Sequence, residues 1–535
     1  MFPSPRSPRR GLPALVALAL CSGGLAHGEG PDPSGSSKNP SLATLVDQPA
    51  SVLVSMGERG LRSDPGLAFA AWRALRVQAE TAPDLLCEAE TGLGRSWLMI
   101  GQAQIALRYA RSVLGRRPSD TGALALHVRA LIRAGTFTDA LRVAEAAKVR
   151  VGLGNADMRA AHAAALYRNR RLVEAEESYR VVLQQQPRNI EALVRLGTGL
   201  LPLASAPASD ELQHAACLQR KGHFGKAQTR MIAHLDAHPS HSTALRMLGE
   251  LLLTIDRSRV PLVRDAFYDR LWTDLLRNRL GSERRLPRGM RKFFPAFGQL
   301  DRARQRMVVW SALPFAGWLR RVAKNGGRHD LMHECERTTD ASERAWLRGR
   351  RTFDGRVWDD VRGIGGLCAA TGVEALDDAH TGGFQTLVHE LAHQVHLYAL
   401  PRVKRDRITV LYRRAKRDGL CLDYYAASNE AEYFAQGVEA FFSYVKVAGQ
   451  PVTHGHTHFE LRRRDPELFA LIGELAEVDP LASGGASLAA RLFEAALQTA
   501  RVADARALLR RLPAEQRTKA RKRALGRATN QFRAL

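Results

Sequence analysis

A helix-forming segment recurs along the first half of this chain and restricts its fold more than any other feature. Its copies read "AQIALRYARSVLGRRP", "TFTDALRVAEAAKVR" and "RLVEAEESYRVVLQQQP", with Ala106, Ala140 and Ala175 in equivalent positions 34 and 35 residues apart. Apolar residues within the copies follow the period of an α-helix. A small residue at a fixed place in a unit of this length lets two helices approach closely, so the pattern predicts stacked helical hairpins.

The unit length resembles that of the tetratricopeptide repeat. Pro118 and Pro187 close two of the units, and a further unit closes at Pro239. The resemblance covers residues 46–255, although most of the Trp and Gly-Tyr positions of the repeat are replaced. It implies an N-terminal α-solenoid whose concave face binds a peptide or a protein partner. An array with a purely structural role, packed on the second half of the chain, fits the same pattern.

The N-terminus has the composition of an export signal. Residues 1–26 begin with several arginines, continue with an apolar stretch from Leu12 to Cys21 and end in small residues. This order predicts a secretory signal peptide and a secreted, periplasmic or cell-envelope protein without a transmembrane segment after its removal. An uncleaved anchor, a disordered basic tail and lipidation of Cys21 are the alternatives. Residues 27–45, rich in Gly, Pro and Ser, are expected to form a disordered linker.

The chain of 535 residues is long enough for two or three domains, and its formal net charge is +25. Arginines spread along the sequence supply most of the excess, including those of a basic helical tail predicted at 481–535. Such a charge attracts nucleic acid and anionic lipid without specificity. No aromatic-plus-basic motif or paired Cys/His spacing occurs, so we expect no specific nucleic-acid partner. The cysteines beyond the signal form no C-x-x-C pair and are expected to be free thiols.

The sequence "LVHELAHQVH" at 387–396 carries the strongest chemical signal. On a helix, His389 and His393 lie one turn apart on one face, so both imidazoles can reach a single ion while Glu390 points alongside. The opposite face is apolar and suits burial. Catalytic zinc takes three protein ligands and keeps a fourth position open. The motif therefore predicts two ligands of a zinc peptidase and requires a third from elsewhere.

A second helix, predicted to start near Asn429, offers carboxylates for the third position. Glu432 and Glu430 both lie in its first turn, and either carboxylate suits zinc. Glu432 also lies three residues after Asn429, a position from which a glutamate often caps the start of a helix, so capping is an alternative role for it. His396 is less suitable, because it lies on the same helix and the sequence lacks the Gly turn and more distant His of the metzincin pattern.

Together, "HELAH" and "YAASNEAEYFAQ" are similar to motifs in the catalytic domain of anthrax lethal factor and its relatives, including Pro-Pro endopeptidases, which are gluzincins. The resemblance implies that Glu432 is the third ligand of one Zn²⁺ ion per chain and that Tyr425 is the catalytic tyrosine, with the adjacent Tyr424 as the fallback. The family often has an acidic residue where Gln436 stands. Glu439, on the same face of the helix, is within reach of that role.

The resemblance implies an α+β zincin-like domain at 256–480, so the expected fold class is multidomain and mainly α. Before the motif, Asp354 and Gly355 lie between two stretches with aromatic and β-branched residues, which is a hairpin signal. We expect a small sheet there. Its strand at 356–366 contains the glycine-rich sequence GIGG and is the candidate edge for main-chain contacts with a substrate.

These residues lead to one main hypothesis and one alternative. The main hypothesis is an exported zinc-dependent metallopeptidase, in which Glu390 is the general base and Tyr425 donates a hydrogen bond to the oxyanion. Its partners would be protein or peptide substrates. The alternative is a catalytically inactive zincin-like domain in a repeat-based interaction scaffold, which would not need Glu390.

Three alternating histidines follow the second helix in the segment "THGHTH". His454, His456 and His458 could form a second metal site, line a substrate-binding loop or be solvated side chains. The sequence leaves these alternatives open.

Overall fold

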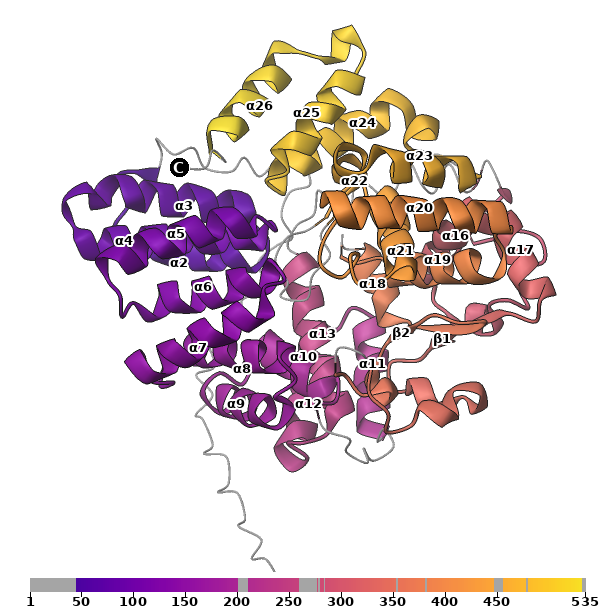
Figure 1. The fold of residues 1–535 in the computed structure, drawn as a ribbon, viewed down its shortest axis with the longest axis horizontal. Helices are drawn as coiled ribbons and strands as arrows, with labels where there is room; N and C mark the ends of the chain where they lie inside the picture. The colour runs from indigo at the N-terminus through magenta and orange to yellow at the C-terminus, as the bar shows by residue number, and fades with distance from the viewer. Residues whose placement is uncertain are drawn as a thin grey trace, which may run out of the picture.

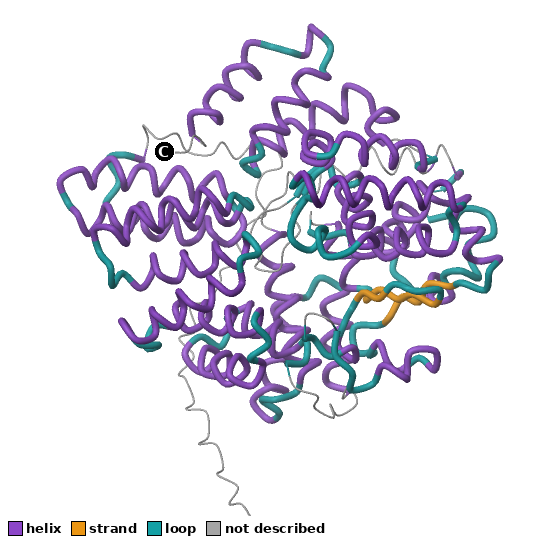
Figure 2. The backbone as a smooth tube through the Cα atoms, in the orientation of Figure 1, coloured by secondary structure: helices purple, strands orange, loops and turns teal. Residues whose placement is uncertain are grey.

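The structure, a computed structural model, is mainly helical (Figures 1 and 2). The predicted signal peptide and nearly all of the predicted linker lie outside the described residues. Within the described part of the chain, no helix combines the length and the apolar character needed to cross a bilayer. The structure describes residues 45–531 except for 201–209, 259–276, 278–279, 283, 353–354, 381–382, 447–455 and 478–479.

The first half of the chain is an array of helices. Its helices are α2 (Ala50–Ser63), α3 (Pro65–Gln78), α4 (Pro83–Met99), α5 (Ala103–Arg116), α6 (Thr121–Arg133), α7 (Phe137–Val151), α8 (Ala156–Arg168), α9 (Leu172–Gln185), α10 (Ile190–Gly197), α11 (Asp210–Arg220), α12 (Phe224–Ala237) and α13 (Ser242–Ser258). From α2 to α10 each helix packs against the next, and contacts also join α4 to α6 and α6 to α8. In Figure 1 the array descends from α2–α5 at the upper left to α10–α13 at the lower centre.

The recurring alanines account for the close packing of these helices. Ala106 in α5, Ala140 in α7 and Ala175 in α9 are all fully buried. Each of these helices packs against the helix before it in the chain. A methyl group permits that approach, whereas a longer side chain would have to displace its neighbours in a close-packed interior.

A capping residue recurs along the array as well. Asp120, Asn155 and Asn189 precede α6, α8 and α10, and the side chain of each accepts a hydrogen bond from a backbone N–H three residues later. Such a cap satisfies a donor that has no partner inside the helix. The sequence therefore specifies where these helices begin as well as which face they bury.

The second half contains a three-stranded sheet in the order β1-β3-β2. Strand β1 (Arg328–Met332) pairs in parallel with β3 (Cys368–Gly372), with Arg328 opposite Cys368. Strand β2 (Gly363–Ile364) pairs antiparallel with β3 and forms the edge of the sheet. The helices of this half are α16 (Arg302–Ala312), α17 (Ala316–Lys324), α18 (Glu374–His380), α19 (Thr386–Tyr398), α20 (Arg402–Asp418), α21 (Glu430–Phe441), α22 (His458–Arg464), α23 (Pro466–Leu475), α24 (Pro480–Gln498), α25 (Val502–Arg511) and α26 (Lys519–Gln531).

The predicted hairpin before the motif forms only in part: Arg351 and Val357 make a single antiparallel bridge, and the backbone N–H of Thr352 donates to the oxygen of Arg356 at 2.8 Å. The chain bends at Gly355, while Asp354 lies outside the described residues. Ser342–Leu347 and Trp358–Asp360 are short 3-10 helices. The strand predicted after the turn is reduced to the two residues of β2.

A buried carboxylate explains this difference. Asp359 accepts hydrogen bonds from Thr339 Oγ1 at 2.6 Å and from the backbone N–H of Gly349 at 2.7 Å. These bonds compensate a buried charge and tie the segment after the turn to Thr339 and Gly349 instead of to a partner strand. The contacts are distant along the chain, so local alternation of side chains did not indicate them.

Three large clusters of buried apolar side chains form most of the core of the described residues, beside a small one around Cys87. Two lie in the helical array, around Trp72 and around Tyr167, and the third lies in the second half around Phe434. Ala500 and Ala528 belong to the same cluster as Trp72. The residues predicted as a basic helical tail therefore pack partly on the start of the array and partly in the core of the second half, to which Leu492 and Leu508 belong.

A buried arginine joins the two halves. Arg246 in α13 is 2% exposed. Its guanidinium pairs with Glu250 at 2.8 Å, donates to the backbone oxygen of Glu334 and lies 3.6 Å from Glu374. The Glu334 carboxylate also pairs with Arg220 of the array at 2.9 Å. Charges that would be costly to bury alone thus compensate one another across the junction.

Replacing Arg246 by Leu should lower the free energy of unfolding by about 3–5 kcal/mol, because it leaves buried carboxylates without their partner. Urea-induced unfolding followed by circular dichroism measures the loss. The control is Arg230→Leu, since Arg230 forms an exposed ion pair with Glu211 in the same array. That change should cost less than about 1 kcal/mol. Equal losses in the two variants would contradict the bridging role of Arg246.

Candidate metal centre

The predicted metal-binding motif lies on α19, the helix at the centre of the second half. Residues 387–396 are all buried, and α16, α17, α21 and the sheet pack around them. Helix α21 packs directly against α19. Asn429 caps α21 by accepting a hydrogen bond from the backbone N–H of Glu432 at 2.9 Å. This cap fixes the first turn of α21 and with it the position of Glu432.

Three side chains from these two helices converge. The Nε2 atoms of His389 and His393 are 3.1 Å apart, and Glu432 Oε2 lies 3.1 Å from the first and 3.6 Å from the second. Ligand atoms held at about 2.0–2.1 Å in a tetrahedral site are about 3.3–3.4 Å apart, so this triangle has the size of one face of a zinc tetrahedron. Among the described residues, no other group of three His, Cys, Asp or Glu side chains could share an ion.

The donor atoms and their surroundings fit zinc. Two imidazole nitrogens and one carboxylate oxygen are ligands that zinc prefers, whereas calcium and magnesium prefer oxygen alone. Glu432 Oε2 is buried and accepts no hydrogen bond of standard geometry from the described residues. A buried carboxylate oxygen without a donor is costly unless a cation compensates its charge.

The carboxylates and imidazoles of the centre shift each other's protonation. Burial alone would raise the pKa of Glu432, but His389 and His393 outweigh it and hold this pKa well below its usual range. Burial alone would lower the pKa of His389, but Glu432 and the neighbouring carboxylates raise it. Burial raises the pKa of Glu390, which favours the proton exchange expected of a general base.

The two alternative ligands pair with each other. Glu430 Oε1 lies 3.3 Å from His396 Nε2, so neither belongs to the converging group. Burial lowers the pKa of His396 to about 4, which leaves its imidazole neutral at pH 7. Glu430 and Glu432 are two residues apart and leave α21 in directions about 200° apart. One carboxylate therefore faces His396 while the other faces the two histidines of the motif.

Strand β2 passes close to the face of α19 that carries the ligands. A methyl group added at Gly363 would come within 2.7 Å of Glu390 Oε1, and one added at Gly365 within 3.2 Å of His393 Cβ. Glycine permits this close approach of a backbone to a neighbouring helix. The glycine-rich end of the predicted strand thus brings a sheet edge beside Glu390.

The loop before α21 holds the two candidate tyrosines. Asp423 Oδ1 accepts hydrogen bonds from the backbone N–H groups of Tyr425 at 2.9 Å and Ala426 at 2.8 Å. Tyr425 is half-buried and is not one of the three converging residues. Tyr424 packs on the helical array, with its ring centre 5.0 Å from that of Phe137. Tyr424, the alternative candidate for the catalytic tyrosine, therefore packs at the junction of the two halves.

Glu439, rather than Gln436, ties α21 to the start of α19. Glu439 is fully buried, and its Oε1 accepts hydrogen bonds from the backbone N–H of Gln385 at 2.9 Å and from Ser443 Oγ at 3.0 Å. It also forms an ion pair with Lys446. The Gln436 amide is buried without a hydrogen-bond partner in the described part of the chain. The sequence analysis did not identify Gln385 and Lys446 as partners of Glu439. The only sequence signal for either was the position of Gln385 directly before the motif helix.

Of the three alternating histidines, the two that the structure describes have separate surroundings. His456 Nε2 lies 3.1 Å from Asp423 Oδ2, and its Nδ1 lies 3.2 Å from Glu460 Oε2. His458 is buried, with its Nδ1 2.8 Å from a backbone oxygen of α21. His454 lies outside the described residues. His456 thus supports the loop before α21 through Asp423, and His458 belongs to the core.

Comparisons with known proteins identify no relative. No protein-family model matches this sequence, and no curated protein or solved structure shows significant similarity to it. The described cysteines are free thiols, as predicted, and none belongs to the converging group. The geometry of the centre therefore carries the functional argument.

Purified protein should contain about one zinc ion per chain. Glu432→Ala should remove most of it, because the change deletes the carboxylate that faces both imidazoles. Glu430→Ala is the matched control and should retain the ion, because Glu430 contacts only His396 of the motif helix. Elemental analysis after dialysis, with circular dichroism to verify folding, measures both. Zinc retained in the first variant and lost in the second would reverse the ligand assignment.

The surroundings of His456 predict a pH-dependent contribution to stability. Burial alone would lower its pKa, but Glu460 and Asp423 raise it to about 9. Because this value exceeds the unfolded pKa of about 6.5, the stabilisation is complete below that pH and is lost as the pH rises through about 9. The stability difference between wild type and His456→Gln should therefore shrink by about 1–3 kcal/mol across this interval. Urea unfolding at several pH values measures it, and a constant difference would contradict the ion pairs.

Proposed function

We propose that this protein is an exported zinc-dependent metallopeptidase. The observation that carries the proposal is the convergence of His389, His393 and Glu432 at the separations that zinc requires, with Glu390 beside them. A purely structural ion would need no buried carboxylate next to its ligands. Burying such a group is costly, so its presence favours a chemical role.

Each residue of the centre has a proposed role in peptide hydrolysis. Zinc held by these three ligands supplies a Lewis acid that polarises a carbonyl and makes water more acidic. Glu390 takes a proton from the attacking water and passes it to the leaving amine. Tyr425, assigned from the resemblance to anthrax lethal factor, donates a hydrogen bond to the oxyanion. Glu439 keeps the first turn of α19, and hence His389, in place.

The substrate is proposed to bind as an added strand along the free edge of β2. Supporting this placement, β2 is the edge of the sheet and its glycines bring it beside Glu390 and His393. Main-chain hydrogen bonds along that edge would hold an extended peptide across the ligand-bearing face of α19.

The finer description of the fold belongs to the same proposal. Helices α2 to α13 would form a tetratricopeptide-like solenoid that binds a protein or peptide, and the second half would be a zincin-like domain. The recurring buried alanines and helix caps support the first assignment. The position of α19 beside a sheet edge supports the second. Export is proposed from the N-terminal sequence alone.

Glu390→Gln should retain zinc and stability but lose peptide hydrolysis by about 10²–10⁴-fold, because the amide cannot act as a general base. Digestion of peptide libraries, analysed by mass spectrometry at equal zinc occupancy, measures this loss. Glu430→Gln is the control and should cleave nearly as well as wild type, since Glu430 lies outside the centre.

Three outcomes distinguish the hypotheses. Cleavage by wild type and the control alone supports the peptidase. No cleavage by any of the proteins, with zinc present and partner binding intact, favours an inactive zincin-like domain in an interaction scaffold. Equal cleavage by wild type and Glu390→Gln would refute the assigned mechanism.

A further inference from the structure

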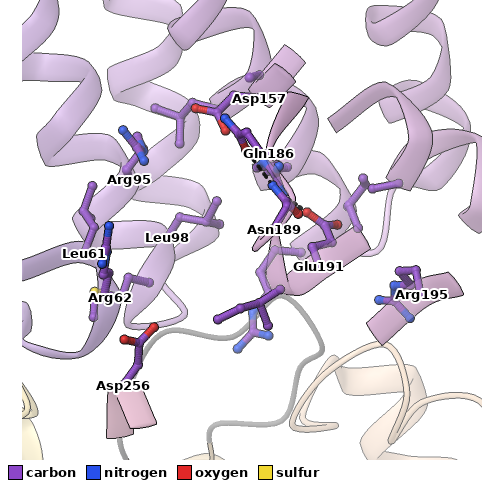
Figure 3. Close-up of a pocket in the computed structure, with 18 of the residues that line it drawn as sticks. Leu61, Arg62, Arg95, Leu98, Asp157, Gln186, Asn189, Glu191, Arg195 and Asp256 are labelled. Carbon is purple, nitrogen blue, oxygen red and sulfur yellow. Dashed lines mark hydrogen bonds and ion pairs between the residues drawn. The ribbon is translucent and has the colours of Figure 1, made fainter. Parts of the chain in front are cut away.

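A cavity of about 890 Å³ lies between helices of the array and extends to the second half at Tyr424. Alternate helices, α4, α6, α8 and α10, contribute to its walls. Figure 3 shows two of these walls, with Arg62 and Arg95 on one side and Asn189 and Glu191 on the other. A cavity of this size accommodates several residues of an extended peptide.

The cavity is strongly basic. Seven arginines line it against three carboxylates. Arg129 is compensated by its ion pair with Glu191. Arg133, Arg168 and Arg195 form no ion pair with any carboxylate that the structure describes, although Arg133 lies within electrostatic range of acidic side chains beyond the cavity and Arg195 within that of Glu191. The positive charge of these three side chains is therefore available to a ligand.

These three arginines gather around two tyrosines. Arg168 lies over the ring of Tyr424 at 5.6 Å and over that of Tyr167 at 5.7 Å. Arg195 lies over Tyr167 at 4.8 Å. All three guanidinium groups, including that of Arg133, act electrostatically on the Tyr424 hydroxyl. Stacking on a ring orients a guanidinium and leaves the N–H groups at its edge able to donate.

Two buried polar groups in the wall have no partner. Arg195 is 6% exposed and Tyr167 is 2% exposed. Neither Arg195 Nε nor the Tyr167 hydroxyl forms a hydrogen bond within the described residues. Buried donors are nearly always paired, so each of these groups is left able to bond to a ligand.

We infer that this cavity binds a carboxylate group of an acidic polypeptide through Arg133, Arg168 and Arg195. A planar guanidinium matches a carboxylate with two parallel hydrogen bonds. Apolar side chains in the same walls, such as Leu98 and Ile132, suit the neighbouring residues of the bound chain. The carboxylate belongs to an acidic side chain or to a free C-terminus. The inference rests on the proposed function, because it names the class of polypeptide that the enzyme takes.

The position of the cavity connects it to the candidate centre. Tyr424 is part of the cavity wall and directly precedes Tyr425 in the loop held by Asp423. A polypeptide anchored by its carboxylate therefore lies against the loop that carries the proposed oxyanion donor.

The test measures binding of short fluorescent peptides by anisotropy to full-length, zinc-loaded Glu390→Gln protein, so that hydrolysis does not interfere. The peptides are glutamate-rich with an amidated C-terminus, neutral with a free C-terminus, neutral and amidated, or lysine-rich. The Arg133→Gln/Arg168→Gln double change should weaken binding of a carboxylate-bearing peptide by about ten- to a hundred-fold.

Two further variants control this comparison. Tyr167→Phe removes only the unpaired hydroxyl and should weaken binding a few-fold without lowering the thermal midpoint. Arg142→Gln removes an exposed arginine of α7 that pairs with Asp139, and should leave binding unchanged. This variant controls for the loss of a positive charge outside the cavity.

Preference for either carboxylate peptide, lost in the double variant, supports the inference and identifies which carboxylate is bound. Equal binding by the double variant and Arg142→Gln would overturn it, as would equal binding of neutral amidated or lysine-rich peptides. Inorganic phosphate that binds at the three arginines more tightly than either carboxylate peptide would also overturn it.

Acidic peptides that bind but are not cleaved by wild type would refute the peptidase alone. Cleavage independent of the arginines would refute this inference alone.

Discussion

Glu439 is fully buried on α21, and its carboxylate accepts a hydrogen bond from the backbone at the start of α19 while pairing with Lys446. A negative charge at a helix N-terminus is stabilised by the unpaired N–H groups there. His389 lies four residues after Gln385, one helical turn from this contact. The relative position of the two helices, and with it the distance from either imidazole to Glu432, therefore depends on a carboxylate that is not itself one of the three converging groups.

Local periodicity explains what the sequence could predict. The alanine spacing predicted the helical array, and the i, i+4 spacing of His389 and His393 predicted their shared face, because both depend only on helix geometry. The choice between Glu430 and Glu432 could not be made from spacing, since it depends on the rotation of α21 against α19. Around Gly355 a single antiparallel bridge between Arg351 and Val357 forms instead of two full strands, and the Asp359 carboxylate of that segment takes its partners from other parts of the chain.

Several side-chain contacts join the two halves of the chain. Arg246 places its charge among carboxylates of both halves, Tyr424 packs on Phe137, and Ala528 near the C-terminus joins the core around Trp72. The array is thus in contact with the second half at its end, along its middle and at its start. A ligand between its helices would meet residues from both halves, and this arrangement allows binding in the array to affect the loop before α21.

The glycines in and just after β2 have a consequence for substrate selectivity. Because Gly363 and Gly365 leave no room for a side chain between the strand and α19, a peptide paired with this edge would be held there mainly through its backbone, which is the same in every protein. Discrimination between one polypeptide and another would then have to come from surfaces away from the scission point. In the proposed peptidase, substrate selection and bond cleavage would then depend on different parts of the chain, and mutation in the helical array could change which polypeptides are bound without changing the reaction.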